Sequence, residues 1–181
     1  MTMRLLDGAL RPDAAAALVL GGAGFALAAA WFIEIVLGVK PCPLCLEQRI
    51  PYYVGLPLAA AGLLVALRAP RSRAIGPLLA LVSIAFVIGS AMGLHHAGVE
   101  AGWWKGPQDC AGTTAAPPAA IQDFLKELST VKVIRCDEVA MRIFGLSLAA
   151  WNAIVAGAAG FFAAAAALRA FLAQGSSSVS Q

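Results

Sequence analysis

The chain has 181 residues, of which 60% are hydrophobic and 13% are charged, and its mean hydropathy is +0.80. A soluble domain of this size carries about 25% charged residues, so a soluble globular protein is excluded. The formal net charge of +3 is small and spread along the chain, which makes nucleic acid a poor partner. The length favours a single domain, residues 1–181.

Four predominantly apolar stretches follow one another along the chain. A helix rises 1.5 Å per residue, so roughly 20 residues cross a hydrocarbon core about 30 Å thick. A segment in lipid must satisfy its own backbone hydrogen bonds, which requires each stretch to be a helix. We therefore predict an all-α membrane protein, a bundle of four transmembrane helices at about residues 14–37, 50–67, 74–94 and 143–168.

The first stretch has a cleavable signal peptide as its alternative, because small residues at 26–30 resemble a cleavage site. It is longer than a usual signal core, however, and the acidic Asp7 and Asp13 precede it. We favour a retained helix. In either case the residues that follow it emerge on the far side of the membrane.

Basic residues predict the orientation of the bundle. They lie before the first helix, between the second and third, and after the fourth: Arg4, Arg11, Arg68, Arg71, Arg73 and Arg169. The positive-inside rule places these segments, and both termini, in the cytoplasm. The opposite face receives a short loop, about residues 38–49, and a long one, about residues 95–142. Within the long loop, residues 119–130 have the pattern of a short amphipathic helix, which either lies on the membrane or packs on the loop.

All four cysteines fall in these two outer loops. Cys42 and Cys45 form a CxxC in the short loop, and Cys110 and Cys136 lie in the long one. Disulfides persist outside the cytoplasm, so structural bridges are one interpretation. A bridge across two intervening residues closes a very small loop and stabilises little, whereas the CxxC spacing is typical of redox exchange. The pattern favours redox chemistry.

Metal binding is a second interpretation of the same residues. Four thiolates, or Cys42 and Cys45 with His95 and His96, could hold zinc or copper. The wide spacing of the two later cysteines does not resemble a zinc finger, and the two histidines are adjacent in sequence. We therefore favour redox exchange over a metal site.

Arg49 follows Cys45 by four residues, at the expected start of the second helix. The helix dipole and free N–H groups stabilise an anion at that position. Residues four apart share a helical face, so the guanidinium of Arg49 would stabilise a Cys45 thiolate and could bond a ligand carbonyl oxygen. The alternative is an arginine that only anchors the helix at the membrane interface.

These motifs together resemble one family. The segment PCPLCLEQR at residues 41–49 is followed by Cys110 and Cys136, then by FGLSL at 144–148 and WN at 151–152. In this order, with four helices, they are similar to DsbB, the bacterial inner-membrane disulfide bond formation protein B. The resemblance spans nearly the whole chain.

The resemblance implies oxidation of a periplasmic thioredoxin-fold dithiol oxidase of the DsbA type, with electrons passed to a membrane quinone, ubiquinone or menaquinone. The partner would attack Cys110 of a Cys110–Cys136 pair. Cys136 would pass electrons to Cys42, and Cys45 would face the quinone. The cysteines would be periplasmic and both termini cytoplasmic.

Two further positions have counterparts in the family. Arg49 matches its quinone-contacting arginine, and a histidine beyond the third helix matches either His95 or His96. A solvated interfacial pair is the alternative for these histidines. Three rival functions stay open: a quinone reductase resembling vitamin K epoxide reductases, a metal-binding membrane protein, and a variant of the same oxidoreductase that serves one dedicated partner.

Overall fold

The computed structural model describes residues 10–106 and 135–178, and within them four helices are long and apolar enough to cross a membrane. The predicted four-helix membrane bundle is thereby confirmed. The elements in chain order are α2 (Pro12–Ile35), α3 (Pro43–Glu47), α4 (Ile50–Arg68), α5 (Ile75–Glu100), β1 (Arg142–Ile143), β2 (Leu146–Ser147) and α7 (Leu148–Ser178). The short α3 and the longer α4 together make one span, Pro43–Arg68.

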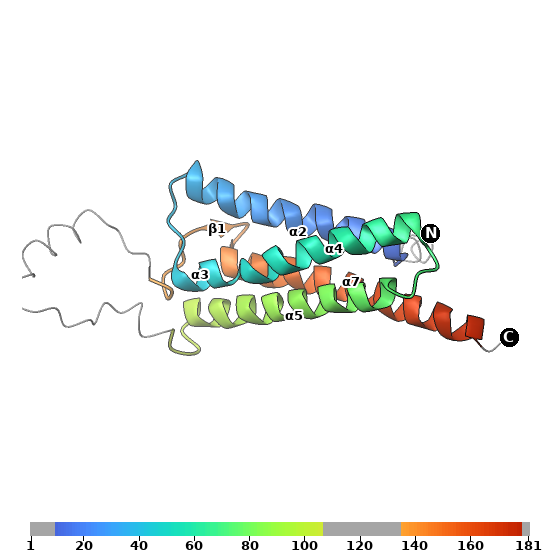
Figure 1. Cartoon of the computed structure of the whole chain (residues 1–181). Helices are drawn as coiled ribbons and strands as arrows, with labels where there is room; N and C mark the ends of the chain where they lie inside the picture. Colours follow the sequence, from blue (N-terminus) through green and yellow to red (C-terminus); the bar gives the residue numbers. More distant parts are fainter. Residues whose placement is uncertain (1–9, 107–134, 179–181) are drawn as a thin grey trace, which may run out of the picture.

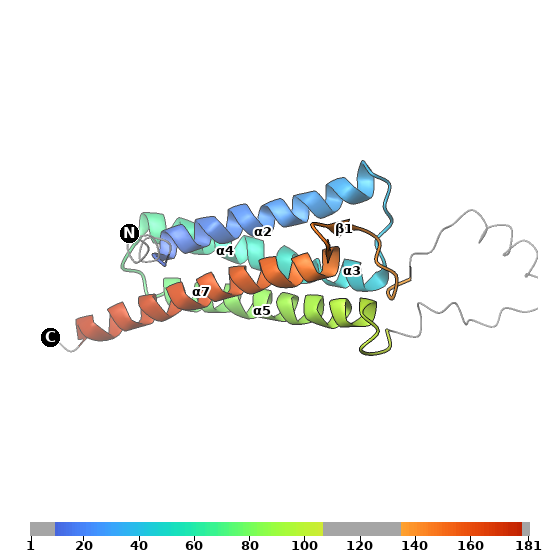
Figure 2. The same cartoon turned by 180° about the vertical axis from the view of Figure 1, so that it is seen from behind.

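The four long helices lie side by side in a ring (Figures 1 and 2). α2 packs against α4 and α7, and α5 packs against the same two helices, so that α2 and α5 are diagonal. α3, the last turn of α5 and the β1–β2 hairpin gather at one end of the bundle, while the link from α4 to α5 lies at the other (Figure 1). Cys42, Cys45 and Cys136 therefore share one end. Cys110 and the amphipathic segment 119–130 lie outside the described residues.

Small side chains let α5 and α7 approach closely. A Cβ added to Gly93 would lie 2.7 Å from the backbone nitrogen of Ala153, closer than any real Cβ contact. The hydroxyl of Ser83 donates to the carbonyl of Gly160 at 3.0 Å, and that of Ser90 donates to the carbonyl of Ala153 at 2.9 Å. Lipid provides no hydrophobic drive for helix association, so close backbone packing and such hydrogen bonds hold the pair together.

The third helix is longer than expected, since α5 continues past residue 94 to Glu100. The two histidines and Glu100 interrupt the apolar run there, so residues 95–100 were expected to belong to the loop. The helix ends in a Schellman motif: the N–H of Gly102 donates to Val99 and that of Trp103 donates to Gly98. Gly102 has φ +74°, a conformation that favours glycine. The extra turns carry His96 and Glu100 to the cysteine end.

The helical structure of the second span begins before Ile50, with α3, and a turn at Gln48 and Arg49 separates it from α4. Pro51 has no N–H and cannot donate to the carbonyl four residues earlier, which breaks the hydrogen-bond ladder. Arg49 and Tyr52 instead donate to carbonyls three residues back, at 3.1 Å each. Gln48 and Arg49 therefore lie at a joint in the helix.

The fourth helix begins at Leu148 and not at residue 143. Residues 142–147 form a two-stranded antiparallel hairpin in which Ile143 pairs with Leu146. Phe144 and Gly145 have φ +50° and +83°, the positive values that a tight two-residue hairpin turn requires. The backbone N–H of Ala150 then donates to the hydroxyl of Ser147 at 3.2 Å, which caps the first turn of α7.

Candidate functional site

The two cysteines of the CxxC lie in sulfur–sulfur contact. Cys42 is the N-cap of α3, and its sulfur accepts a hydrogen bond from the backbone N–H of Cys45 at 3.3 Å. Pro43 is the first helical residue, where its missing N–H is not needed. This cap turns the Cys42 thiol toward Cys45. The Cys42 thiol donates a hydrogen bond to the Cys45 sulfur at 2.9 Å. Both are thiols in this structure.

The third described cysteine, Cys136, comes from the long loop and joins the pair. It is fully buried in a cluster with Cys42 and Val99, against which Leu44 and Cys45 also pack. The spacing of the cysteines in the sequence did not predict that Cys136 would lie in the same buried cluster as Cys42. The structure brings three of the four predicted cysteines into one buried cluster, and the fourth, Cys110, is outside the described residues.

The hydrogen bond between the two thiols has an electrostatic consequence for Cys42. Donation to the Cys45 sulfur, together with burial, raises the pKa of the Cys42 thiol to about 12. A hydrogen bond from His96 opposes this shift. Cys42 is therefore the donor of the hydrogen bond between the two sulfurs, and Cys45 is its acceptor.

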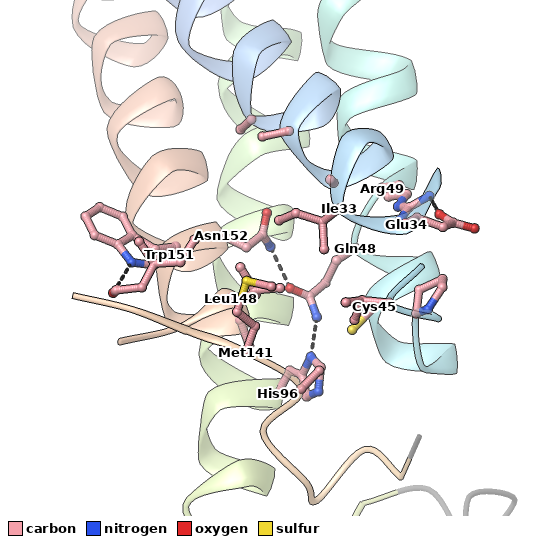
Figure 3. Close-up of a pocket in the computed structure, with 18 of the residues that line it drawn as sticks. Ile33, Glu34, Cys45, Gln48, Arg49, His96, Met141, Leu148, Trp151 and Asn152 are labelled. Atoms are coloured by element: carbon pink, nitrogen blue, oxygen red, sulfur yellow. Dashed lines mark hydrogen bonds and ion pairs between the residues drawn. The ribbon is translucent and has the colours of Figure 1, made fainter. Parts of the chain in front are cut away.

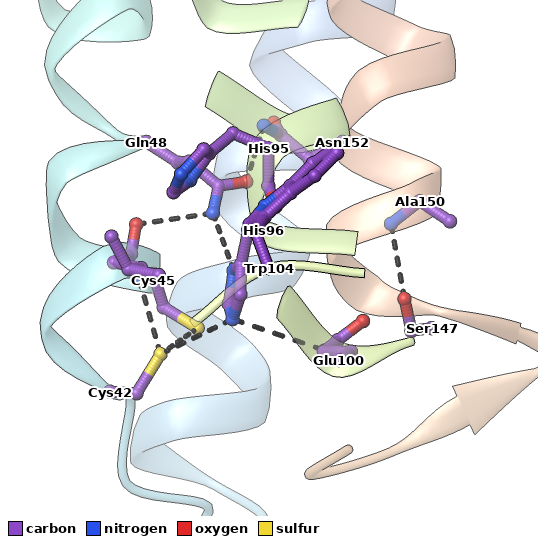
Figure 4. A network of polar contacts seen from close by, with 11 residues as sticks. Cys42, Cys45, Gln48, His95, His96, Glu100, Trp104, Ser147, Ala150 and Asn152 are labelled. Carbon is purple, nitrogen blue, oxygen red and sulfur yellow. Dashed lines mark hydrogen bonds and ion pairs between the residues drawn. The ribbon is translucent and has the colours of Figure 1, made fainter. Parts of the chain in front are cut away.

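The two adjacent histidines have different surroundings. His96 is 3% exposed, and its Nε2 lies 3.7 Å from the sulfur of Cys42 and 4.0 Å from Oε1 of Glu100. His95 is exposed and stacks on the ring of Trp104 at 5.7 Å. Only His96 points toward the cysteines (Figure 4). Of the two candidates, geometry favours His96 as the site residue.

A chain of polar side chains crosses the bundle from His96. Nε2 of Gln48 lies 2.7 Å from Nδ1 of His96, and Oε1 of Gln48 accepts from Nδ2 of Asn152 at 2.7 Å. Oδ1 of Asn152 accepts from the hydroxyl of Tyr52 at 2.6 Å. Gln48 and Asn152 belong to the quoted sequence motifs, but the sequence assigned them no role.

Arg49 is buried, and its partners differ from the expected one. Its guanidinium forms an ion pair with Glu34 at 2.6 Å and lies over the ring of Trp31 at 5.1 Å. The expected stabilisation of a Cys45 thiolate by Arg49 stays a prediction, because the contacts found for the guanidinium are those with Glu34 and Trp31. The helix joint before Ile50 turns the side chain toward α2 instead. Figure 3 shows the pair beside Cys45.

A cavity of about 440 Å³ opens between α2, α4, α7 and the hairpin (Figure 3). Its polar end is formed by the cysteine pair and the side chains next to it, including Cys45, Gln48, Arg49, His96, Glu100 and Asn152. From there it follows α2 down to Phe25 and Gly22, in the middle of that helix, between apolar walls. Such a cavity suits a ligand with a compact polar head and an apolar tail.

The same cluster has the composition of a metal site. The sulfurs of Cys42 and Cys45 and a ring nitrogen of His96 lie within 4.8 Å of one another. Soft thiolates with one imidazole suit zinc or copper(I). Among the described residues the geometry alone therefore permits both redox exchange and metal binding.

Glu34 and Glu100 are site residues that the sequence analysis missed. The side chain of Glu34 is 30% exposed and that of Glu100 is 8% exposed, although both belong to membrane-spanning helices. A carboxylate near the end of an apolar stretch is a signal for a functional position. That rule would have found both residues, but not their partners, which come from the packing of the helices.

Comparisons with known proteins agree on one family. The family model for Disulfide bond formation protein DsbB matches residues 12–167. Disulfide bond formation protein B of Xanthomonas oryzae pv. oryzae is 27% identical over 134 residues, which cover 71% of this chain and 74% of that protein. The protein of the same name in Saccharophagus degradans is 27% identical over 143 residues, covering 76% and 81%. No solved structure matches the chain significantly.

Proposed function

This chain belongs to the DsbB family of disulfide bond formation membrane proteins, and from that premise we propose that it is a thiol:quinone oxidoreductase. Its task would be to reoxidise a periplasmic dithiol oxidase of the DsbA type and to pass the electrons to a membrane quinone. The observation that carries the proposal is the position of the CxxC. Cys42 and Cys45 are in contact with each other, beside buried Cys136, at the polar end of an apolar cavity.

The proposed electron path consists of thiol–disulfide exchanges. The partner's thiolate attacks Cys110 of a Cys110–Cys136 disulfide, and the partner's second thiol then closes the partner's own disulfide, leaving two reduced thiols on the loop. The Cys136 thiolate attacks Cys42 of a Cys42–Cys45 disulfide and releases the Cys45 thiolate. Attack by Cys110 on Cys136 restores the loop disulfide and leaves the CxxC reduced. The burial of Cys136 against Cys42 supports this order.

The residues around the cavity fit a quinone. A bound quinone would supply the oxidising power, accepting two electrons and two protons as the Cys42–Cys45 disulfide re-forms. Arg49 would donate a hydrogen bond to a carbonyl oxygen of its head, and Cys45 would face the ring. Phe25 and the neighbouring apolar residues of α2 would hold the tail.

Turnover with purified components tests the proposal. The protein in detergent, reduced DsbA-type partner and ubiquinone or menaquinone are mixed, and quinone reduction is followed. Cys45→Ala should abolish turnover. Arg49→Ala should raise the KM for quinone by about tenfold or more, because it removes one hydrogen bond from a charged donor. Arg71→Ala, an exposed arginine in the link between α4 and α5, is the matched control. Native activity without Cys45, or no turnover with either quinone, contradicts the proposal.

A metal-binding membrane protein is the second candidate, favoured by the close approach of two sulfurs and a ring nitrogen. It predicts stoichiometric zinc or copper in the purified reduced protein and indifference to quinone. Cobalt(II) substitution distinguishes the two, because thiolate ligation gives an intense charge-transfer band that Cys42→Ser would remove.

A further inference from the structure

The polar chain that runs from Tyr52 to His96 lies in the buried interior at the cysteine end (Figure 4). It joins α4, α7, the joint after α3, and α5 through three hydrogen bonds of 2.6 to 2.7 Å. Tyr52, Gln48 and His96 are each no more than 6% exposed. A buried network of this kind fixes which atoms donate and which accept, because an unsatisfied group there is costly.

Two backbone carbonyls fix the orientation of both amides. Nε2 of Gln48 also donates to the carbonyl of Leu44 at 3.1 Å, and Nδ2 of Asn152 also donates to the carbonyl of Gly89 at 3.4 Å. A carbonyl can only accept, so reversing either amide would place oxygen against oxygen. Nε2 of Gln48 is therefore the donor toward Nδ1 of His96, and Nδ1 is the acceptor.

A neutral imidazole carries one proton, so an accepting Nδ1 places that proton on Nε2. Nε2 faces the sulfur of Cys42 at 3.7 Å and Oε1 of Glu100 at 4.0 Å. The other oxygen of Glu100, Oε2, is buried and has no hydrogen-bond partner among the described residues. Glu100 is thus a carboxylate directed at His96 from one helical turn further along α5.

We propose that Gln48, oriented by Asn152 and Tyr52, is a positioning residue that holds the proton of His96 on Nε2, so that His96 donates a hydrogen bond to the sulfur of Cys42. The donor stabilises Cys42 whenever it carries negative charge, as when it leaves a disulfide as a thiolate. Glu100 is the alternative acceptor for the same N–H. The assignment also works against a metal ion at the cluster, since Nε2 would need a free lone pair to bind one.

Only one part of this inference rests on the proposed function, namely that the hydrogen bond stabilises the Cys42 thiolate during disulfide exchange. The main test of the inference does not involve quinone. The chain has two histidines, so ¹⁵N-histidine labelling gives two pairs of imidazole nitrogen signals, and His95→Gln identifies the Nδ1 and Nε2 signals of His96. Spectra of the reduced protein in detergent are recorded at pH 9, above the ordinary histidine pKa of about 6.5. We expect a protonated Nε2 and an unprotonated Nδ1. A protonated Nδ1 in the native chain overturns the proposal.

Gln48→Glu tests the role of Gln48 itself. A carboxylate can only accept, so we expect the proton of His96 to move to Nδ1 at pH 9. Gln174→Glu, the same change near the far end of α7, should leave the spectrum unaltered. An Nε2 proton that stays in place in Gln48→Glu would show that Gln48 does not position it.

The contact with Cys42 has its own readout. In a Cys45→Ala background, the rate at which iodoacetamide alkylates Cys42 at pH 9 reports how well its thiolate is stabilised. Adding Gln48→Glu should lower that rate about fivefold, the worth of one hydrogen bond, and Gln174→Glu should not. An unchanged rate in the Gln48→Glu chain would refute the link to Cys42, whatever the turnover assay gives.

Discussion

At the residue scale, the CxxC divides its roles through one hydrogen bond. Cys42 donates to the Cys45 sulfur and is one of the buried residues of the cluster with Cys136, whereas Cys45 is the acceptor and is only partly buried. Both cysteines line the polar end of the cavity, and Cys42 is the one buried together with the loop cysteine. The pair is therefore asymmetric in its hydrogen bond and in its burial.

This asymmetry predicts the order of alkylation in the reduced protein. At pH 8, iodoacetamide should modify Cys45 before Cys42, because a pKa raised to about 12 leaves almost no Cys42 thiolate. The Cys42 rate should keep rising with pH beyond 10. In Cys45→Ala the hydrogen bond that raises the pKa is gone, so the Cys42 rate should rise at pH 8 and level off at a lower pH. Peptide mass mapping measures both rates, and Cys42 reacting first in the native chain would contradict this account.

Arg49 depends on Glu34 at the same scale. Glu34→Gln removes the carboxylate from the guanidinium of Arg49, a residue that is 8% exposed, so we expect a loss of stability of about 1–3 kcal/mol. Thermal unfolding in detergent measures it. In an Arg49→Gln background the same change should cost clearly less, because the pair is already broken. Equal costs in the two backgrounds would mean that the ion pair contributes nothing.

The element scale shows what sequence reasoning could and could not reach. Apolar length identified all four spans, because the bilayer fixes how many residues a helix needs. The ends were less predictable: His96 and Glu100 are polar yet helical, and His96 lies between the sulfur of Cys42 and the carboxylate of Glu100. The CxxC was found from its spacing, Cys136 from its place in an outer loop, and the histidine pair from the family resemblance. The Glu34–Arg49 pair was not, because it joins two helices whose facing sides only the packing decides.

Gly93 tests the close packing of α5 on α7. Gly93→Ala would place a methyl group against the backbone of Ala153 and force the helices apart, costing about 1–3 kcal/mol. Gly21→Ala in α2 is the matched control, because nothing lies within 4 Å of its added Cβ and alanine favours helix. Thermal unfolding in detergent compares them. The interpretation fails if both variants unfold at the same temperature.

At the scale of the whole molecule, the chemistry is confined to one end of the bundle. The three described cysteines, His96, Glu100 and the Glu34–Arg49 pair gather there. The arginine-rich link and both ends of the described chain lie at the other end (Figures 1 and 2). This polarity fits the orientation that the basic residues predict, with the cysteine end outside the cytoplasm.

Two alanines at matched positions test the orientation. Ala69 and Ala101 are exposed C-cap residues of α4 and α5, at opposite ends of the bundle. Each is changed to cysteine in a chain whose four native cysteines are serine. In intact spheroplasts, a membrane-impermeant maleimide should label Ala101→Cys at once and Ala69→Cys only after permeabilisation. The reverse pattern would invert the topology.

The cavity descends along α2 to Gly22, and Phe25 on its wall is 77% exposed within a membrane-spanning helix. An exposed side chain at that depth faces lipid, so a ligand can enter sideways from the bilayer without passing through water. For the proposed quinone, supply would then depend on its mole fraction among the lipids and on how much of the quinone pool is already reduced. The rate of disulfide formation in exported proteins would in this way follow the respiratory state of the cell.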